Sequence, residues 1–222
     1  MHILCLDHYD SFTLNLTDWL KRRQKNLTIE VVFPDDQGAI EGLIRKALPL
    51  VLSPGPRSPS EATSALRVLD AVVGKAPVLG VCLGAQILGK WAGFDVVRSC
   101  YPLHGSTKTI ELTTDNSKLF QGVEDGSRVA CYHSLVLKEG ARPVKAGWNV
   151  VARCERGEIM AIEQESDSGW LVAGVQFHPE SFLSRKTGVL ADNWLRSVRE
   201  WYEYRDGAFG SVDTNHNKMR HN

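Results

Sequence analysis

The sequence lacks any apolar run that approaches the roughly 18 residues needed to cross a bilayer as a helix. It lacks net charge too, because 26 lysines and arginines balance 26 aspartates and glutamates. It also lacks a Cys-x-x-Cys pair, and its five cysteines have no regular spacing. These absences argue against a membrane span, a nucleic-acid surface, a zinc site and a disulfide framework.

Apolar residues, by contrast, make up 43% of the 222 residues, which is enough for a sizeable core. At a prior of roughly 150 residues per domain, the length predicts one domain or slightly more. The first residues contain no basic region and reach a charge at Asp7, so we expect no secretory signal. Free cysteines indicate a reducing compartment, and we expect a cytoplasmic protein.

The first half of the chain alternates short apolar runs with apolar stripes at helical spacing. The runs predict strands at Ile3–Leu6, Thr28–Phe33, Leu50–Leu52 and Pro77–Val81. Ser58-Pro59-Ser60-Glu61 fits a capping box and predicts a helix from Pro59 to Val73. Alternation of strand and helix predicts a mostly parallel sheet with helices on both faces, and ligands bound beyond the carboxyl ends of its strands.

After Gly93 the pattern changes to short strands with turns between them, which predicts an antiparallel β portion. The expected strands are Phe94–Val97, Thr107–Leu112, Arg128–Tyr132, Leu135–Lys138, Trp148–Cys154, Ile159–Gln164 and Trp170–Phe177. A last helix is expected over Gly188–Tyr204. We therefore expect one domain over residues 1–204 and a polar, mobile tail over residues 205–222.

Cys82 lies where a predicted strand passes directly into a predicted helix. Gly80 and Gly84, two residues to either side, permit a turn too tight for residues with a Cβ. This arrangement is typical of a nucleophile elbow. The N-terminus of the following helix favours a thiolate and stabilises a developing oxyanion.

His178 and Glu180 lie in an extended segment far along the chain, and residues two apart point to the same side. The carboxylate can therefore orient the imidazole, and the imidazole can serve Cys82 as a base. On these residues alone, an inert buried thiol at Cys82 and a simple turn at His178 stay open as alternatives.

Six segments in order along residues 1–200 carry a resemblance to a known family. They are Tyr9-Asp10-Ser11-Phe12-Thr13, Ser53-Pro54-Gly55-Pro56, Gly80-Val81-Cys82-Leu83-Gly84-Ala85-Gln86, His104-Gly105, Tyr132-His133-Ser134-Leu135 and Gly174-Val175-Gln176-Phe177-His178-Pro179-Glu180-Ser181. The chain resembles class I (triad) glutamine amidotransferases, in particular the glutaminase components of anthranilate and aminodeoxychorismate synthases. The resemblance implies a flavodoxin-like α/β fold.

The resemblance also implies an activity and the residues that carry it. L-glutamine would be hydrolysed through a γ-glutamyl thioester, with Cys82, His178 and Glu180 as catalytic triad. Backbone N–H groups of Gly55 and Leu83 would form the oxyanion hole. The substrate would lie against a larger set of residues: Gly55, Pro56, Arg57, Gln86, Ser134 and Leu135. No metal or organic cofactor is implied for this half reaction.

The family likeness further implies a partner, a chorismate-binding synthase subunit that receives the ammonia. It leaves the anthranilate and aminodeoxychorismate pathways open, with residues 7–11 favouring the latter slightly. Two positions depart from the common pattern: Arg57 stands where glycine is usual, and Ala85 where many relatives carry histidine. The competing hypotheses are another thiol hydrolase on the same scaffold and a non-catalytic regulatory subunit.

Overall fold

The parallel half of the sheet is built by the first four strands and by one strand from near the end of the chain. They are β1 (His2–Leu6), β2 (Thr28–Val32), β3 (Leu50–Leu52), β4 (Val78–Val81) and β9 (Val172–Val175). Their order is β2-β1-β3-β4-β9, and every neighbouring pair is parallel. This structure is a computed structural model that describes residues 1–141, 143–165 and 169–210.

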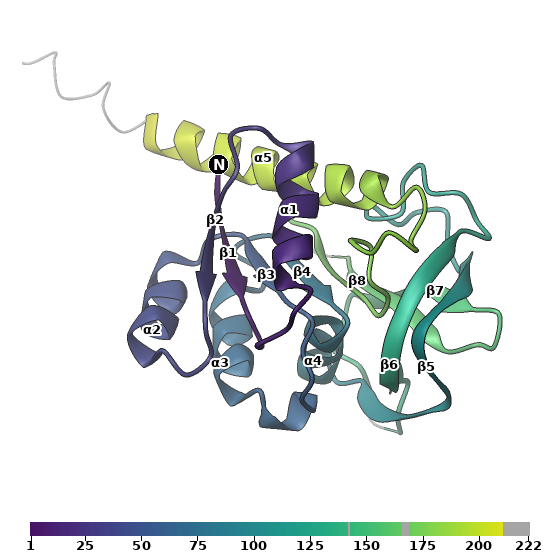
Figure 1. The fold of residues 1–222 in the computed structure, drawn as a ribbon. Helices are drawn as coiled ribbons and strands as arrows, with labels where there is room; N and C mark the ends of the chain where they lie inside the picture. The colour runs from purple at the N-terminus through teal and green to yellow at the C-terminus, as the bar shows by residue number, and fades with distance from the viewer. Residues whose placement is uncertain (142, 166–168, 211–222) are drawn as a thin grey trace, which may run out of the picture.

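The antiparallel half extends the same sheet through four further strands, seen at the right of Figure 1. They are β8 (Ile159–Gln164), β7 (Trp148–Cys154), β5 (Asp95–Leu112) and β6 (Arg128–Lys138). The joint is β9, which is parallel to β4 and antiparallel to β8. The expected antiparallel portion is therefore a continuation of the parallel sheet.

Helices cover both faces of the parallel half (Figure 1). On one face lie α1 (Thr13–Arg23) and α5 (Gly188–Gly210), and on the other α2 (Gln37–Lys46), α3 (Thr63–Val72) and α4 (Leu83–Ala92). Alternate side chains of β1 enter two separate cores, because successive residues of a strand face opposite ways. No helix in the described ranges is long and apolar enough to cross a membrane.

Several predicted boundaries were wrong. Two pairs of short strands were expected where the structure has two long strands, β5 and β6. Between Arg98 and Leu103 the pairing of β5 with β6 shifts register, but β5 continues. The expected helix from Pro59 is a 3₁₀ turn, Pro59–Glu61, followed by α3. Ala62, at φ −88° and ψ 48°, interrupts the helical path, and the Ser58 hydroxyl caps only the short turn.

The last helix continues to Gly210 and does not end at Tyr204. The part of the predicted tail that covers residues 205–210 is thus helical. The remaining residues, 211–222, lie outside the described residues. The expected domain boundary stays a prediction.

Because β1, β3, β4 and β9 pair in parallel, the loops that follow them lie at one edge of the sheet. Leu6 pairs with Leu52, Leu52 with Gly80, and Gly80 with Gly174. The residues that follow these strands therefore meet, although they are far apart in sequence: Asp7, Ser53, Cys82 and Gln176. Ligands bind at this carboxyl edge in open α/β sheets.

Gly84 lets α4 approach this edge closely. A Cβ on Gly84 would lie 2.2 Å from the carbonyl oxygen of Leu52, and a Cβ on Gly80 would lie 2.6 Å from the carbonyl oxygen of Gly84. Both clashes involve backbone atoms, which cannot rotate away. The two glycines therefore fix how near the helix lies to β3 and β4.

We expect Gly84→Ala to lower the free energy of unfolding by at least about 3 kcal/mol, because α4 would have to move off the sheet. Gly42→Ala in α2 is the matched control. A Cβ there meets no atom within 4 Å, and alanine stabilises a helix interior by up to about 1 kcal/mol. Urea unfolding measures both; equal stability of the Gly84 variant and the wild type would contradict the close approach.

Candidate active site

Cys82 occupies a strained turn between β4 and α4, with φ 52° and ψ −105°. Non-glycine residues are uncommon at positive φ, and such strain costs on the order of 1–3 kcal/mol. Neighbouring backbone holds it there, since the Cys82 N–H donates to the Val175 carbonyl at 2.9 Å and the Gly84 N–H donates to the Ser53 carbonyl at 3.1 Å. The turn places the thiol at the N-terminus of α4, as expected of a nucleophile elbow.

His178 and Glu180 follow β9, the strand that pairs with β4. The His178 N–H donates to the Ala130 carbonyl at 2.9 Å, which fixes the backbone. Its Nδ1 lies 2.7 Å from Glu180 Oε1, and both side chains are buried. A hydrogen bond with Cys82 is also among the causes that raise the pKa of His178. The structure therefore brings the three predicted triad residues together.

The pKa of His178 reflects two opposing influences. Burial lowers it, but the hydrogen bonds and negative charges of Cys82 and Glu180 outweigh burial and raise the pKa to about 10. At neutral pH the His178 imidazole is therefore protonated, and it holds this proton beside the Cys82 sulfur.

Two aromatic rings enclose the His178 imidazole, and the sequence analysis missed their role. The ring centroid of Phe12 lies 5.2 Å from that of His178, and the Tyr132 centroid lies 5.1 Å from it. Both distances suit cation–π attraction to an imidazolium. Phe12 and Tyr132 were visible only as members of two family segments.

A cavity of about 710 Å³ opens beside Cys82. Its wall includes all the residues predicted for the oxyanion hole and for substrate binding: Gly55, Pro56, Arg57, Leu83, Gln86, Ser134 and Leu135. His178 and Glu180 are buried, and within the described residues they are not part of this wall. Of the three predicted triad residues, Cys82 is therefore the one that faces the cavity.

Gln86 is held inside the protein by its side-chain amide. Its Nε2 donates to the Leu135 carbonyl at 2.9 Å and to Gln176 Oε1 at 3.1 Å. Gln176 Nε2 in turn lies 3.8 Å from the Cys82 sulfur. This chain of contacts ties α4 to β6 and to the thiol. Gln176 was missed, although it lies two residues before His178 and so shares its side of the extended segment.

The Ser53–Gly55 loop is fixed by the turn after β1. The His8 N–H donates to the Ser53 hydroxyl at 2.8 Å. A Cβ on Gly55 would lie 2.6 Å from Leu83 Cδ2 and 2.7 Å from His8 Cβ, so only glycine fits. Gly55 and Leu83, the two predicted oxyanion donors, therefore lie against each other beside Cys82.

The two residues that depart from the family pattern, Arg57 and Ala85, differ in their exposure to solvent. Arg57 is exposed, with its guanidinium carbon 5.9 Å from the Tyr9 ring centroid. Ala85 is buried, and a Cβ on Gly174 would lie 3.0 Å from its Cβ. A larger side chain at position 85 would have little room on the side of β9.

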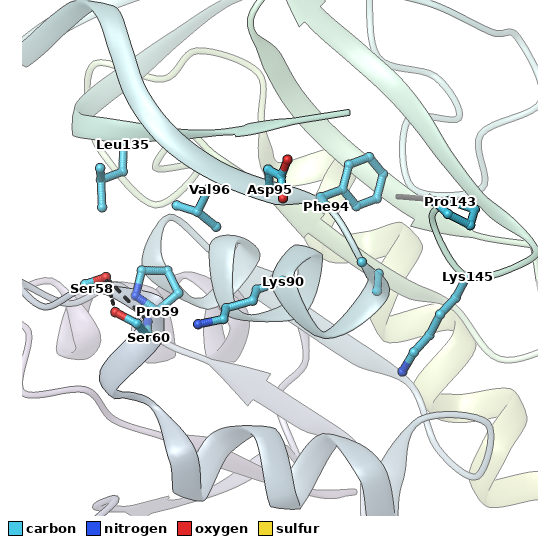
Figure 2. A pocket seen from close by; sticks show the side chains of 12 residues that line it. Ser58, Pro59, Ser60, Lys90, Phe94, Asp95, Val96, Leu135, Pro143 and Lys145 are labelled. Atoms are coloured by element: carbon cyan, nitrogen blue, oxygen red, sulfur yellow. Dashed lines mark hydrogen bonds between the residues drawn. The ribbon is translucent and has the colours of Figure 1, made fainter. Parts of the chain in front are cut away.

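A second cavity, of about 580 Å³, adjoins the first and shares Ser58 and Leu135 with it. Figure 2 shows its wall, which carries Lys90, Lys145 and the hydrogen-bonded pair Ser58 and Ser60. Its lining residues include none of the three predicted triad residues. Within the described ranges, no group of three or more His, Cys, Asp or Glu side chains could hold a metal ion.

Comparison with known proteins fits this geometry. The family model for class-I glutamine amidotransferases matches residues 4–197. The chain belongs to this family. A Bacillus subtilis relative, named aminodeoxychorismate/anthranilate synthase component 2, is 37% identical to this amidotransferase over 200 residues, covering 89% of this chain and 97% of the relative. An Escherichia coli aminodeoxychorismate synthase component 2 is 38% identical over 201 residues, covering 87% and 98%.

A solved structure of similar fold is that of a glutamine amidotransferase from Thermotoga maritima. Its TM-score to this chain is 0.65, at 20% identity and with coverage of 93% of this chain and 85% of that one. At this identity the likeness concerns the fold alone. The predicted fold class, a mostly parallel sheet flanked by helices with an antiparallel portion, is confirmed.

We expect the free energy of unfolding to fall more steeply with rising pH in the wild type than in Cys82→Ser. The folded pKa of His178, about 10, lies above its ordinary value of 6.5. Its stabilisation is therefore complete below pH 6.5 and is lost as the pH rises through about 10. Serine removes the sulfur of Cys82, whose hydrogen bond and charge are causes of the raised pKa of His178.

Between pH 6.5 and pH 10 the wild type should lose more of its free energy of unfolding than Cys82→Ser does. At roughly 1.4 kcal/mol per pKa unit, the difference should be on the order of 1–3 kcal/mol. Urea unfolding at pH 6, 7, 8, 9 and 10 measures it. Burial lowers the pKa of His8 and of His133 to about 4, which costs stability at acid pH equally in both proteins. Parallel curves for the two proteins would show that the thiol and the imidazole are not coupled.

Proposed function

We propose that this amidotransferase is the glutaminase subunit of a chorismate-using synthase and that Cys82, His178 and Glu180 are its catalytic residues. The observation that carries the proposal is the Cys82 thiol on a strained strand–helix turn, with a buried imidazole–carboxylate pair beside it. The names of the relatives support the partner class, since they are component 2 subunits of anthranilate and aminodeoxychorismate synthases.

The Cys82 thiolate attacks the side-chain amide carbon of L-glutamine. The backbone N–H groups of Gly55 and Leu83 stabilise the oxyanion that forms. His178 gives its proton to the departing nitrogen, so that ammonia leaves and a γ-glutamyl thioester remains. His178 then takes a proton from water, which attacks the thioester and releases glutamate and the free thiol. Over the cycle, glutamine and water become glutamate and ammonia.

The partner would lie over the carboxyl edge of the sheet. Exposed apolar side chains flank this edge: Tyr9 is 46% exposed, Leu14 76% and Phe182 88%. Phe12, between Tyr9 and Leu14, contacts the His178 ring. A synthase docked on this surface would touch the segment that packs on the catalytic base. Five free cysteines support the further proposal of a cytoplasmic location.

The first experiment measures glutamate release from glutamine by the purified chain, alone and with each of two synthase subunits, one for anthranilate and one for aminodeoxychorismate. We expect release that increases with at least one partner and vanishes in Cys82→Ser. Stimulation by one partner identifies the pathway, and stimulation by both identifies a shared subunit. No release under any condition would favour a regulatory subunit, and full activity without a partner would favour a free-standing thiol hydrolase.

A second prediction concerns His178. In the complex, His178→Ala should reduce glutamine-dependent synthesis by at least about 100-fold, because proton transfer is lost. Synthesis from added ammonium salt should continue at the wild-type rate, since the partner's chemistry needs only ammonia. Glu180→Gln should fall between the wild type and His178→Ala, because the amide still orients the ring but carries no charge. Loss of both activities in His178→Ala would point to a structural role.

A further inference from the structure

A small hollow lies at the amino edge of the parallel strands, the edge opposite the Cys82 turn. Its volume is about 200 Å³. Ala47, Lys75 and Trp170 line it, and they come shortly before β3, β4 and β9, so parallel pairing brings their loops together. The last turns of α5 complete the lining. We call this site the amino-edge hollow.

α5 is held against this edge by the start of the chain. The His2 N–H donates to the Tyr202 hydroxyl at 3.0 Å, and the same hydroxyl donates to the His2 carbonyl at 2.5 Å. Figure 1 accordingly shows the chain's N-terminus beside the later part of α5. The side of the hollow that α5 supplies is therefore fixed to β1.

The lining of the amino-edge hollow is positively charged. Lys46, Lys75 and Arg205 line it, and none of its described lining residues is an aspartate or a glutamate. Lys46 has a loose partner, because its Nζ lies 3.7 Å from Glu30 Oε2 and the two side chains are 53% and 42% exposed. Within the described part of the chain, Lys75 and Arg205 form no ion pair. The hollow therefore carries positive charge that no neighbouring carboxylate neutralises.

Three aromatic rings form the rest of the hollow. Trp201 is buried, and its Nε1 donates to the Lys75 carbonyl at 2.6 Å. The ring centroids of Trp170 and Tyr204 lie 5.5 Å apart at an interplanar angle of 64°, and Tyr204 is 66% exposed. The Arg205 guanidinium carbon lies 4.6 Å from the Trp201 centroid, in cation–π contact. Rings and guanidinium thus support one another in the free protein.

This combination of charge, rings and size selects a class of ligand. The positive lining disfavours cations, and a simple inorganic anion would leave the aromatic rings uncovered. At about 30 Å³ per water, the hollow has room for roughly seven waters, which suits one substituted ring and excludes a nucleotide. An aromatic ring packs edge to face on tryptophan and tyrosine, and a carboxylate accepts two parallel hydrogen bonds from a guanidinium.

We propose that the amino-edge hollow binds a small aromatic carboxylate. The carboxylate lies on Arg205 and Lys75, and the ring lies against Trp170 and Tyr204. None of the described lining residues of the hollow also lines the cavity beside Cys82. The inference is therefore independent of the proposed glutaminase function and can fail or hold without it.

The test titrates the ¹⁵N-labelled full chain with benzoate and follows the indole N–H signals, of which Trp170 is identified by its loss in Trp170→Phe. We expect a saturable shift of the Trp170 signal with a Kd on the order of 1 mM, which a ligand of this size can reach. Cyclohexanecarboxylate lacks the π-system and benzyl alcohol lacks the charge, so both should bind several-fold more weakly. Acetate and phosphate should bind more weakly still.

Arg205→Met should raise the Kd for benzoate by about 10-fold or more, because a charge-assisted hydrogen bond is lost. Arg205→Lys should raise it by a smaller factor, since lysine keeps the charge and loses the planar fork. Trp170→Leu should raise it about 3- to 10-fold through loss of an aromatic contact. Urea unfolding shows whether each variant is folded, and the lysine variant serves if the methionine variant is not.

Arg45→Met is the matched control. Arg45 is exposed in the last turn of α2, next to Lys46, and does not line the hollow. Its replacement should leave the Kd unchanged. A Kd raised as much in Arg45→Met as in Arg205→Met would show attraction by net charge alone and would overturn the proposal.

Three other outcomes would also overturn it. They are no saturable binding of benzoate, binding that leaves the Trp170 signal unmoved, and phosphate or cyclohexanecarboxylate bound as tightly as benzoate. The second would place the ligand elsewhere on the protein, and the third would show an anion site without recognition of an aromatic ring. Glutamine hydrolysis enters none of these measurements, so a failure here leaves the proposed function untouched.

Discussion

The positive φ of Cys82 is the constraint on which the rest of the site depends. A turn this tight holds only if the helix that follows lies almost on the sheet, and Gly80 and Gly84 make that approach possible. Hydrogen bonds from the turn to Val175 and from Gly84 to Ser53 then anchor it to both neighbouring strands. Cys82, the loop that contains Gly55 and the strand before His178 are thus positioned by one backbone arrangement.

The second contribution is electrostatic and depends on burial. Glu180 and His178 are almost entirely removed from water, so their interaction is stronger than on a surface. Burial alone would favour a neutral imidazole, but the carboxylate, the thiol and two aromatic rings all favour the charged form. The imidazole therefore holds a proton beside the Cys82 sulfur at neutral pH.

The two halves of the sheet contribute different parts of the site. The parallel strands end beside one another and supply the Cys82 thiol, the proposed triad partners and the loop with the proposed oxyanion donor Gly55. The antiparallel strands β5 and β6 complete the cavity wall with Arg98, Ser134 and Leu135. β9 joins the halves, because it pairs with β4 on one side and with β8 on the other. The proposed triad residues and the cavity wall thus depend on one continuous sheet.

Short-range sequence was enough to predict the first four strands of the parallel half and the elbow at Cys82, because these depend on residues within a few positions of one another. It was wrong for β9, which was expected in the antiparallel portion but pairs in parallel with β4. It failed where distant pairing decides the outcome: β5 continues through its irregular stretch because β6 pairs with it on both sides. The contact of Gln176 with Cys82 spans 94 positions, and the Ser99–Glu158 bond spans 59. No local preference encodes such neighbours. They arise because hydrogen bonding between strands places distant segments at one edge of the sheet, and only the tertiary structure shows which side chains meet there.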